Sequence, residues 1–341
     1  MLLLFSMASV LSAQSGGIVG RVVSNETGEP LGYSIISLTK QGSAFFASDS
    51  GRFSILNLAP GPLEIEVRRL GYTPSHLTAH ITAGISDTVT VRLSRVAFQL
   101  GTLTVRASPV CKTPGAPSIG DDSTLMGIFG QLRQNADQYR FLTEAYPFQY
   151  VMDVQQISRL TDGTNTSSDV GHRLVRGRRA RRYEAGKAVV FNGSEWIFQI
   201  PTLVEFADER FVDSHCFHLV GVEPINDSSF IRIDMIASDA IKDADVNGSM
   251  YLDAESFQVR RTVLSLSRQA KDIPELLGVE VTTEFREIFP GISIINRARL
   301  VSSRIPTPKA PYAEFVEEQV ASQVLFEGRM PGKDALNRKK K

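Results

Sequence analysis

Apolar and polar residues alternate along much of this chain, and this period of two limits what the chain can fold into. Residues 63–68 (LEIEVR) and 88–93 (TVTVRL) place an apolar side chain at every second position. Successive side chains of a β-strand point to opposite faces, so each stretch forms a half-buried strand with one apolar face. The sequence therefore predicts a mainly β protein.

Turn-forming residues separate the alternating stretches at regular intervals. Glycine permits positive backbone φ angles, and an aspartate can cap a turn with its side chain. Short strands with this punctuation are typical of a β-sandwich, which we expect over residues 16–107. The predicted turn residues are Gly28, Asp49, Gly51, Gly61 and Gly71.

Four sequence blocks occur in order in this region: GIVGRVVSNETGEPL (17–31), SDSGRF (48–53), LAPGPLEIEV (58–67) and RLGY (69–72). Together they resemble the carboxypeptidase regulatory-like domain. The resemblance implies a seven-stranded, transthyretin-like Greek-key sandwich, grouped with the carbohydrate-binding-like folds. Domains of this family are often joined to peptidases or to outer-membrane TonB-dependent receptors. It also implies a bacterial envelope protein.

The first 13 residues are mostly apolar and end in small residues, followed by Gln14. This pattern predicts a signal peptide over residues 1–13, although a positively charged start is missing and a buried strand is the alternative. No apolar run approaches the roughly 18 residues of a membrane-spanning helix, so none is expected. We therefore expect export to the periplasm or to the outer membrane of a Gram-negative-type bacterium.

Proline and glycine interrupt any periodicity over residues 108–122, which predicts a linker. A helix is expected next, because apolar residues recur every three to four positions from Leu125 to Tyr139. Residues 123–330 then show several strand and hairpin patterns, which predict a larger antiparallel β domain with one or two helices. Residues 331–341 are predicted to be a basic, solvated tail.

One hairpin pattern in this second domain, GSMYLDAESFQVR (248–260), resembles the periplasmic lipoprotein-carrier-like folds. Those folds are curved antiparallel sheets wrapped around helices. The resemblance implies an apolar interior that can hold acyl chains.

The sequence contains no recognised catalytic motif. None of the five histidines begins a His-x-x-Glu motif, and nucleophile-elbow, phosphate-loop and dinucleotide-binding motifs are absent. His215, Cys216 and His218 form the densest metal-ligand candidate, but on a strand His215 points away from the other two. We therefore predict no catalytic residue, metal or cofactor, while a hydrolase site in the second domain stays an open alternative.

A basic segment is the main candidate for ligand binding. Six guanidinium groups occur within ten residues, and arginine binds phosphate and carboxylate groups bidentately. They predict an anion-binding segment, and the alternative is a solvated face balanced by nearby carboxylates. The overall charge of +0, from 37 basic and 37 acidic residues, argues against a nucleic-acid partner. The six residues are Arg173, Arg176, Arg178, Arg179, Arg181 and Arg182.

The chain has two cysteines, Cys111 and Cys216. Disulfides persist in oxidising compartments, so we expect these two to be bonded if the chain is exported. The bond would pin the linker to the second domain. Two free thiols are the alternative.

Together these observations favour a non-enzymatic, exported envelope protein that binds a glycan, a lipid or an outer-membrane partner. The alternatives are a hydrolase and a relative of an outer-membrane receptor. The length argues against the receptor, because the residues after the first domain are too few for a plug and a 22-stranded barrel. The ligand and the oligomeric state do not follow from the sequence.

Overall fold

The computed structural model of the chain describes residues 15–97, 110–115, 123–177, 183–194, 196–225 and 228–328. These residues form two compact units, the first ending at Val96 and the second beginning at Ala97. The predicted signal peptide (1–13) and basic tail (331–341) lie outside the described residues, as do residues 98–109 and 116–122 around the predicted linker. The predicted domain boundaries therefore stay predictions.

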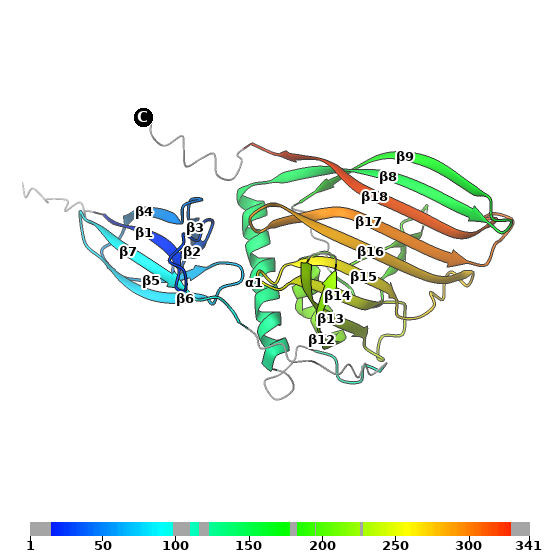
Figure 1. Cartoon of the computed structure of the whole chain (residues 1–341), viewed down its shortest axis with the longest axis horizontal. Coiled ribbons are helices and arrows are strands. Elements are labelled where there is room, and N and C mark those ends of the chain that lie inside the picture. Colours follow the sequence, from blue (N-terminus) through cyan, green and yellow to red (C-terminus); the bar gives the residue numbers. More distant parts are fainter. Residues whose placement is uncertain are drawn as a thin grey trace, which may run out of the picture. The chain divides into compact units, whose positions relative to one another are not determined.

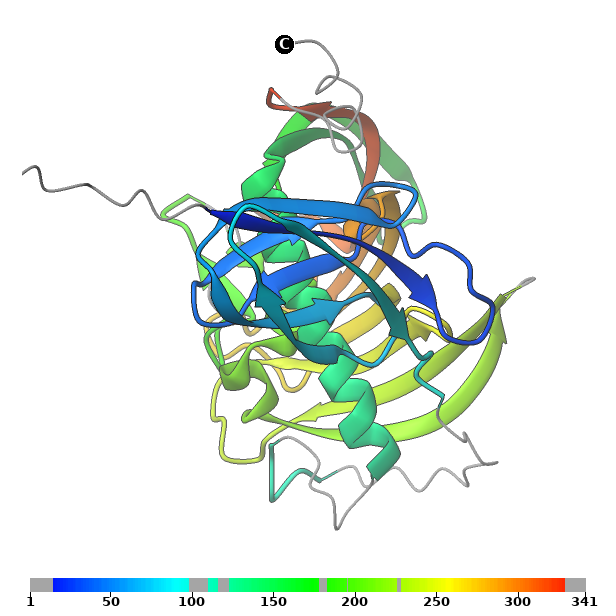
Figure 2. The same ribbon diagram turned by 90° about the vertical axis from the view of Figure 1, so that its left-hand side faces the viewer.

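The N-terminal unit consists of two β-sheets (Figures 1 and 2). One sheet has the strand order β4-β1-β7, in which β1 and β7 are parallel, and the other has the order β3-β2-β5-β6. The strands are β1 (Gly16–Ser24), β2 (Ile35–Leu38), β3 (Ser43–Phe46), β4 (Arg52–Leu58), β5 (Gly61–Arg68), β6 (Ser75–Ile81) and β7 (Ser86–Leu93).

The core of this unit follows from the alternation of its strands. Ile65 and Val67 of β5 are buried together with Ile18 of β1, Ile36 of β2 and Val91 of β7. In β5 and β7 the intervening polar residues, such as Glu64 and Arg92, lie on the opposite face, whereas β1 and β2 bury apolar residues at consecutive positions as well. The predicted succession of strands, with apolar faces turned inward, is confirmed.

The C-terminal unit is dominated by one nine-stranded antiparallel sheet with the order β12-β13-β14-β15-β16-β17-β18-β8-β9. Strands β12 to β18 follow one another along the chain, and the earlier β8–β9 hairpin joins beyond β18. The strands are β8 (Phe148–Leu160), β9 (Asn165–Arg176), β12 (His215–Ile225), β13 (Ser228–Ala237), β14 (Val246–Asp253), β15 (Val259–Leu266), β16 (Leu276–Phe289), β17 (Ile292–Arg304) and β18 (Tyr312–Phe326).

Three smaller elements and one long helix complete this unit. They are α1 (Ser123–Ala145), the two-stranded hairpin β10 (Val189–Phe191) and β11 (Trp196–Phe198), the 3-10 helix η1 (Glu205–Ala207) and α2 (Glu209–Val212). The predicted antiparallel β domain with one or two helices is confirmed. Strands β8 and β9 were not predicted from the sequence. The first half of β8 does alternate, with Phe148, Tyr150 and Met152 buried, whereas β9 is an edge strand whose described side chains are almost all exposed and gives no such signal.

Helix α1 lies across one end of the large sheet, and the long strands β8, β9, β16, β17 and β18 extend beyond it (Figure 1). Figure 2 shows α1 running obliquely across the curved sheet. The helix buries most of its apolar side chains, and its Phe129 ring packs edge-on against Phe217 of β12, with the ring centres 4.7 Å apart. The Asn135 amide of α1 donates hydrogen bonds to the Ser256 and Phe257 carbonyls at the β14–β15 turn, at 3.3 and 2.8 Å.

The strand register defines two faces of this sheet. Val154, Gln319, Ala298, Thr283, Thr262 and Met250 are successive cross-strand neighbours from β8 to β14, so they share one face. That face, which also carries Phe217 and the buried Met152, is here called the helix side, and the opposite face the outer side. Among the described residues, no helix has both the length and the apolar character needed to cross a membrane.

Candidate functional site

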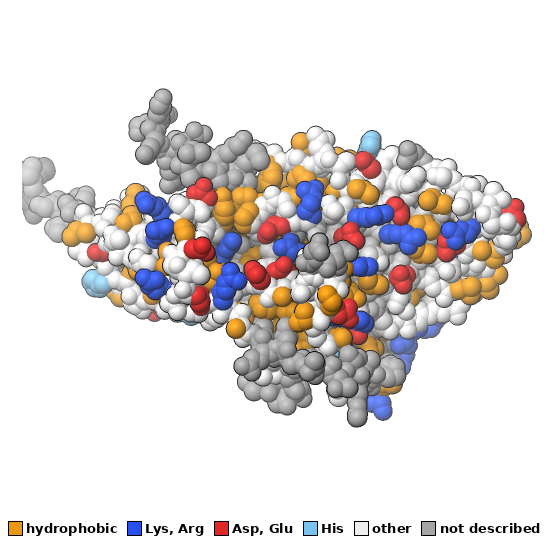
Figure 3. All heavy atoms as spheres, in the orientation of Figure 1, with side chains coloured by type: hydrophobic (Ala, Val, Ile, Leu, Met, Phe, Trp, Pro, Cys, Tyr) orange, Lys and Arg blue, Asp and Glu red, His pale blue; other side chains and the backbone are white. Residues whose placement is uncertain are grey.

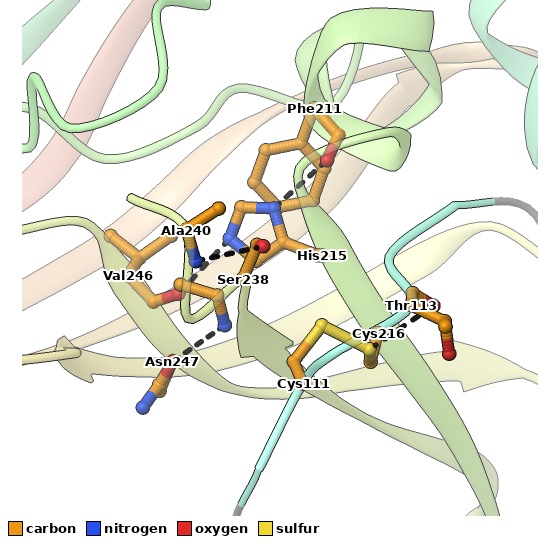
Figure 4. Close-up of a disulfide and its surroundings, with 10 residues drawn as sticks. Cys111, Thr113, Phe211, His215, Cys216, Ser238, Ala240, Val246 and Asn247 are labelled. Carbon is orange, nitrogen blue, oxygen red and sulfur yellow. Dashed lines mark hydrogen bonds between the residues drawn. A yellow bond between two sulfur atoms is a disulfide. The ribbon is translucent and has the colours of Figure 1, made fainter. Parts of the chain in front are cut away.

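The disulfide between Cys111 and Cys216 is present, with the two Cα atoms 5.6 Å apart, which confirms the predicted pairing. It ties segment 110–115 to the beginning of β12, an edge strand of the sheet (Figure 4). Two backbone hydrogen bonds support the attachment: Asp239 N–H donates to the Cys111 carbonyl, and Gly115 N–H donates to the His215 carbonyl, both at 3.0 Å. The bond therefore has a structural role at the sheet edge.

The predicted turn glycines, Gly28, Gly51, Gly61 and Gly71, all have positive φ. At Gly51 glycine is required twice over, because φ is 71° and a Cβ atom would lie 2.5 Å from the Val22 carbonyl oxygen. The predicted capping role of Asp49 is wrong. Ser48 caps this turn, since its hydroxyl accepts a hydrogen bond from Arg52 N–H at 3.1 Å, whereas the Asp49 carboxylate makes none with any described residue.

His215 and Cys216 point to opposite faces of β12, as the alternation predicts. The His215 ring is fully buried, and its two nitrogens lie 2.8 and 3.1 Å from the carbonyl oxygens of Phe211 and Val246 (Figure 4). The ring therefore has no free nitrogen for a metal or a substrate. Within the described ranges, no group of three or more His, Cys, Asp or Glu side chains could hold a metal ion.

A buried acid–phenol pair lies beside this histidine. The Tyr183 hydroxyl donates to the Asp245 carboxylate, which also accepts from Gly186 N–H at 2.9 Å and Val246 N–H at 2.8 Å. Burial raises the pKa of Tyr183, and the adjacent carboxylate raises it further. Burial lowers the pKa of His215, although Asp245 acts in the opposite direction. Because these groups are buried and bonded to each other or to the backbone, they stabilise the fold and cannot reach a ligand.

The structure separates the two described residues of the predicted anion-binding segment. Arg173 pairs with Met152 and lies on the helix side, whereas Arg176 pairs with Gln149 and lies on the outer side. The other four residues lie outside the described part of the chain: Arg178, Arg179, Arg181 and Arg182. Binding of an anion by this segment stays a prediction.

Arg173 belongs to a group of polar side chains that the sequence analysis did not find. The Glu317 carboxylate accepts a hydrogen bond from the Gln156 amide at 2.8 Å and one from the Gln319 amide at 2.6 Å. Arg173 reaches from β9 across β8 to within 4.0 Å of the same carboxylate. The Glu317 side chain is 16% exposed and that of Arg173 57% exposed, so a bound anion would meet the guanidinium first.

Two aromatic rings continue this group along β18. Phe315 and Tyr312 lie on the helix side opposite Ser158 and Leu160, with their ring centres 6.0 Å apart. Both rings are half-buried. We call these six residues, Gln156, Arg173, Tyr312, Phe315, Glu317 and Gln319, the Glu317 surface.

The Glu317 surface begins where the helix side changes from apolar to polar. Leu264, Val281 and Leu300 are successive cross-strand neighbours in β15, β16 and β17, and Glu317 and Gln156 continue that row in β18 and β8. The first two are fully buried, Leu300 is half-buried, and the row ends in side chains that keep hydrogen-bonding capacity. The sheet therefore presents a polar surface beside its apolar core.

The outer side of the same strands has a different character. Glu318 forms ion pairs with Arg297 and Arg299, both at 3.2 Å, and Arg159 pairs with Glu314 at 3.2 Å. Figure 3 shows basic and acidic side chains lying beside one another over this sheet. Opposite charges that pair locally on an exposed face are typical of a solvated surface.

No simple sequence signal marks the Glu317 surface. Phe315, Glu317 and Gln319 follow a period of two, which is visible once β18 is known to be a strand. Gln156 and Arg173 join them only through strand pairing over large separations in sequence.

The family of the carboxypeptidase regulatory-like domain matches residues 17–94. The resemblance of the N-terminal unit to this family is confirmed. No curated protein matches the chain.

Solved structures similar to the chain include a minor pilin of Streptococcus agalactiae, at 19% identity and a TM-score of 0.22, over 27% of this chain and 49% of the pilin. A DUF1329 family protein from Desulfovibrio piger is 11% identical over 59% of this chain and 95% of its own, with a TM-score of 0.30. A LolA superfamily protein from Nitrosomonas europaea is 14% identical over 60% of this chain and 98% of its own, with a TM-score of 0.28. At these low scores the similarities carry no argument about function.

Proposed function

We propose that this chain is an exported envelope protein that binds a polar ligand on the Glu317 surface without transforming it. The observation that carries the proposal is the Glu317 carboxylate, held by two amides and approached by an arginine on three neighbouring strands. The side chains stand on three adjacent, hydrogen-bonded strands, so the group is arranged before a ligand arrives. Such preorganisation reduces the entropic cost of binding.

The hydrogen bonds within this group leave capacity for a ligand. Each amide uses one N–H toward Glu317, and its carbonyl oxygen and second N–H have no hydrogen-bond partner among the described residues. The Arg173 guanidinium has five N–H donors and touches Glu317 only at 4.0 Å. The surface can therefore donate and accept hydrogen bonds at the same time.

A polar ligand suits this surface better than an acyl chain. Covering Glu317 and Arg173 with hydrocarbon would remove two charged groups from water, which is costly without compensating hydrogen bonds. A ligand with hydroxyl or acidic groups would replace the lost water contacts.

Binding also suits the surface better than catalysis. His172 of β9, the histidine next to Arg173, pairs with Asp153 and lies on the outer side. Glu317 is already bonded to two amide donors, and His215 is buried elsewhere. The surface thus contains fixed hydrogen-bonding groups and, among its described residues, no histidine or cysteine.

Export is part of this proposal. The apolar residues 1–13 resemble a signal peptide, and a disulfide joins the only two cysteines of the chain. Disulfides of this kind persist in oxidising compartments such as the periplasm.

The strand register supplies matched variants for the test. Arg173→Gln and Glu317→Gln change the helix side, whereas Arg176→Gln and Glu318→Gln make the same chemical changes on the outer side of the same strands. The full chain is titrated with lipopolysaccharide, neutral and acidic oligosaccharides, and phospholipid vesicles. We expect at least one polar component to bind and only the helix-side variants to lose affinity.

Two results would contradict the proposal. Equal losses in both pairs of variants would place binding elsewhere. Turnover of a bound oligosaccharide that disappears in Glu317→Gln would show an enzyme instead.

A further inference from the structure

The Glu317 surface combines three kinds of group that one class of ligand uses together. It has half-buried aromatic rings at Phe315 and Tyr312, amides at Gln156 and Gln319, and an exposed guanidinium at Arg173. A sugar ring has flat C–H faces, which pack on aromatic rings, and hydroxyl edges, which both donate and accept hydrogen bonds. Neutral sugars can be bound by the rings and the amides alone, whereas the Arg173 guanidinium favours a ligand that also carries a carboxylate or phosphate group.

The position of Arg173 supports a role in recognising an anion. Its closest approach to Glu317 is 4.0 Å, longer than the 2.8 and 2.6 Å contacts of the two amides, so it forms no tight bidentate pair there. The amides already satisfy both Glu317 oxygens. The planar guanidinium, 57% exposed, keeps the geometry that matches a carboxylate or phosphate group.

The neighbouring basic residue of this face is committed elsewhere. Arg304 donates to the Tyr312 hydroxyl and to Glu275, both at 3.2 Å, and its guanidinium lies 5.1 Å from the Tyr312 ring centre. It therefore fixes the position of the ring. Arg173 is the guanidinium that stays open to a ligand on the Glu317 surface.

We infer that the ligand of the Glu317 surface is an anionic saccharide. Arg173 binds the acidic group of a sugar, Gln156 and Gln319 bind its hydroxyls, and Phe315 packs against the face of a sugar ring. This inference rests on the proposed function and adds the chemical class of the ligand.

The experiment compares four probes by calorimetric titration of the full chain. Tetragalacturonate carries sugar rings and carboxylates, maltotetraose has the rings without the charge, inorganic phosphate has the charge without the rings, and phosphatidylglycerol vesicles supply an anionic lipid surface. We expect tetragalacturonate to bind at least about tenfold more tightly than the other three, because one charge-assisted contact is worth about that factor. Rising salt should weaken its binding.

Three variants assign the contacts. Arg173→Gln should lose about tenfold in affinity for tetragalacturonate and a smaller factor for maltotetraose, which has no acidic group for the guanidinium. Phe315→Leu keeps an apolar side chain and should weaken both saccharides severalfold, because it removes the ring face. Arg176→Gln, on the outer side of the same strand, should bind like the unchanged chain.

The outcomes separate this inference from the proposed function. If maltotetraose binds as tightly as tetragalacturonate and Glu317→Gln weakens both, the proposed function stands and the anionic class is wrong. If only the vesicles bind, or if phosphate binds as tightly as tetragalacturonate, a saccharide is not the ligand. If Arg173→Gln and Arg176→Gln weaken tetragalacturonate equally, Arg173 is not its contact.

Discussion

The two units of this protein bury the apolar faces of their β-sheets in different ways. In the N-terminal unit two small sheets cover each other, so the apolar faces of β1, β2 and β5 meet in one core. In the described part of the C-terminal unit one nine-stranded sheet dominates, the other sheet is the two-stranded β10–β11 hairpin, and helices and irregular segments bury much of the apolar surface. Helix α1 and residues 183–214 bury aromatic side chains such as Phe206 and Phe211.

This difference explains where polar groups are buried. Ser24 and Ser34 are buried in the N-terminal unit, whereas the C-terminal unit buries the charged or titratable Glu205, His215 and Asp245. Irregular segments bring backbone groups inside that a strand ladder does not satisfy, so side chains must bond them. The C-terminal unit therefore combines apolar packing with specific buried polar contacts and a disulfide, whereas the N-terminal unit is held mainly by apolar packing.

Removing the disulfide should give the largest loss of stability, and only in the C-terminal unit. Cys111 and Cys216 are 105 residues apart, and a cross-link over a loop of that length stabilises by about 5 kcal/mol in the chain-entropy model. In the Cys111→Ser, Cys216→Ser double variant we expect the free energy of unfolding of the C-terminal unit to decrease by about that amount. Calorimetry of the full chain reports both units at once, and an equal shift in both transitions would contradict their independence.

Shortening a core side chain should have the complementary effect on the sandwich. Ile65 is 2% exposed, so Ile65→Ala leaves a cavity and should cost about 3 kcal/mol in the N-terminal unit. Glu64→Ala, the exposed neighbour on the other face of β5, is the matched control and should change little. A loss in the C-terminal transition instead would mean that the two units share a core.

Two turn glycines of the N-terminal unit differ in the space around them, so replacing them should have different costs. Gly28 and Gly51 have nearly equal φ angles, 73° and 71°. A Cβ atom added at Gly28 would have no neighbour within 4 Å, whereas one added at Gly51 would lie 2.5 Å from the Val22 carbonyl oxygen. Gly28→Ala should cost about 1–2 kcal/mol for the left-handed backbone alone. Gly51→Ala should cost about 1 kcal/mol more, because the hydrogen bond from Val22 N–H to the Gly51 carbonyl must shift. If Gly28→Ala and Gly51→Ala lowered the urea midpoint of unfolding equally, the clash with the Val22 carbonyl oxygen would contribute nothing.

Acidification should give the smallest effect and should act on the C-terminal unit alone. Burial lowers the pKa of His215, so below about pH 6.5 the unfolded chain takes up a proton that the folded unit does not. The stability that depends on neutral His215 is complete above that pH. It is lost as the pH falls, by at most about 1.4 kcal/mol per pH unit for one proton. Urea midpoints between pH 7.5 and 5.5 measure the slope. The unfolding transition of the N-terminal unit, recorded in the same samples, is the internal reference.

The sequence by itself determined the fold class, the strands of the sandwich and most strands of the second unit. These follow from local patterns: alternation in β5 and β7, glycine at positive φ in turns, and the three- to four-residue spacing in α1. The disulfide was also predictable, because the chain offers only one pair of cysteines. The capping residue of the turn at residues 48–52 was not, since Ser48 and Asp49 both suit that role and only the backbone geometry selects one.

The tertiary structure alone decided which face each strand residue occupies in the large sheet and which distant residues meet there. The β8–β9 hairpin precedes β12 in the chain but pairs beyond β18, so Gln156 meets Glu317 across 161 positions of sequence. The bulge between Val154 and Gln155 in the β8–β9 pairing fixes the face of Arg173, because a shift of one residue reverses every side chain of a strand. For that reason the sequence predicted a cluster of arginines, whereas the fold divides the two it describes between the opposite sides of the sheet.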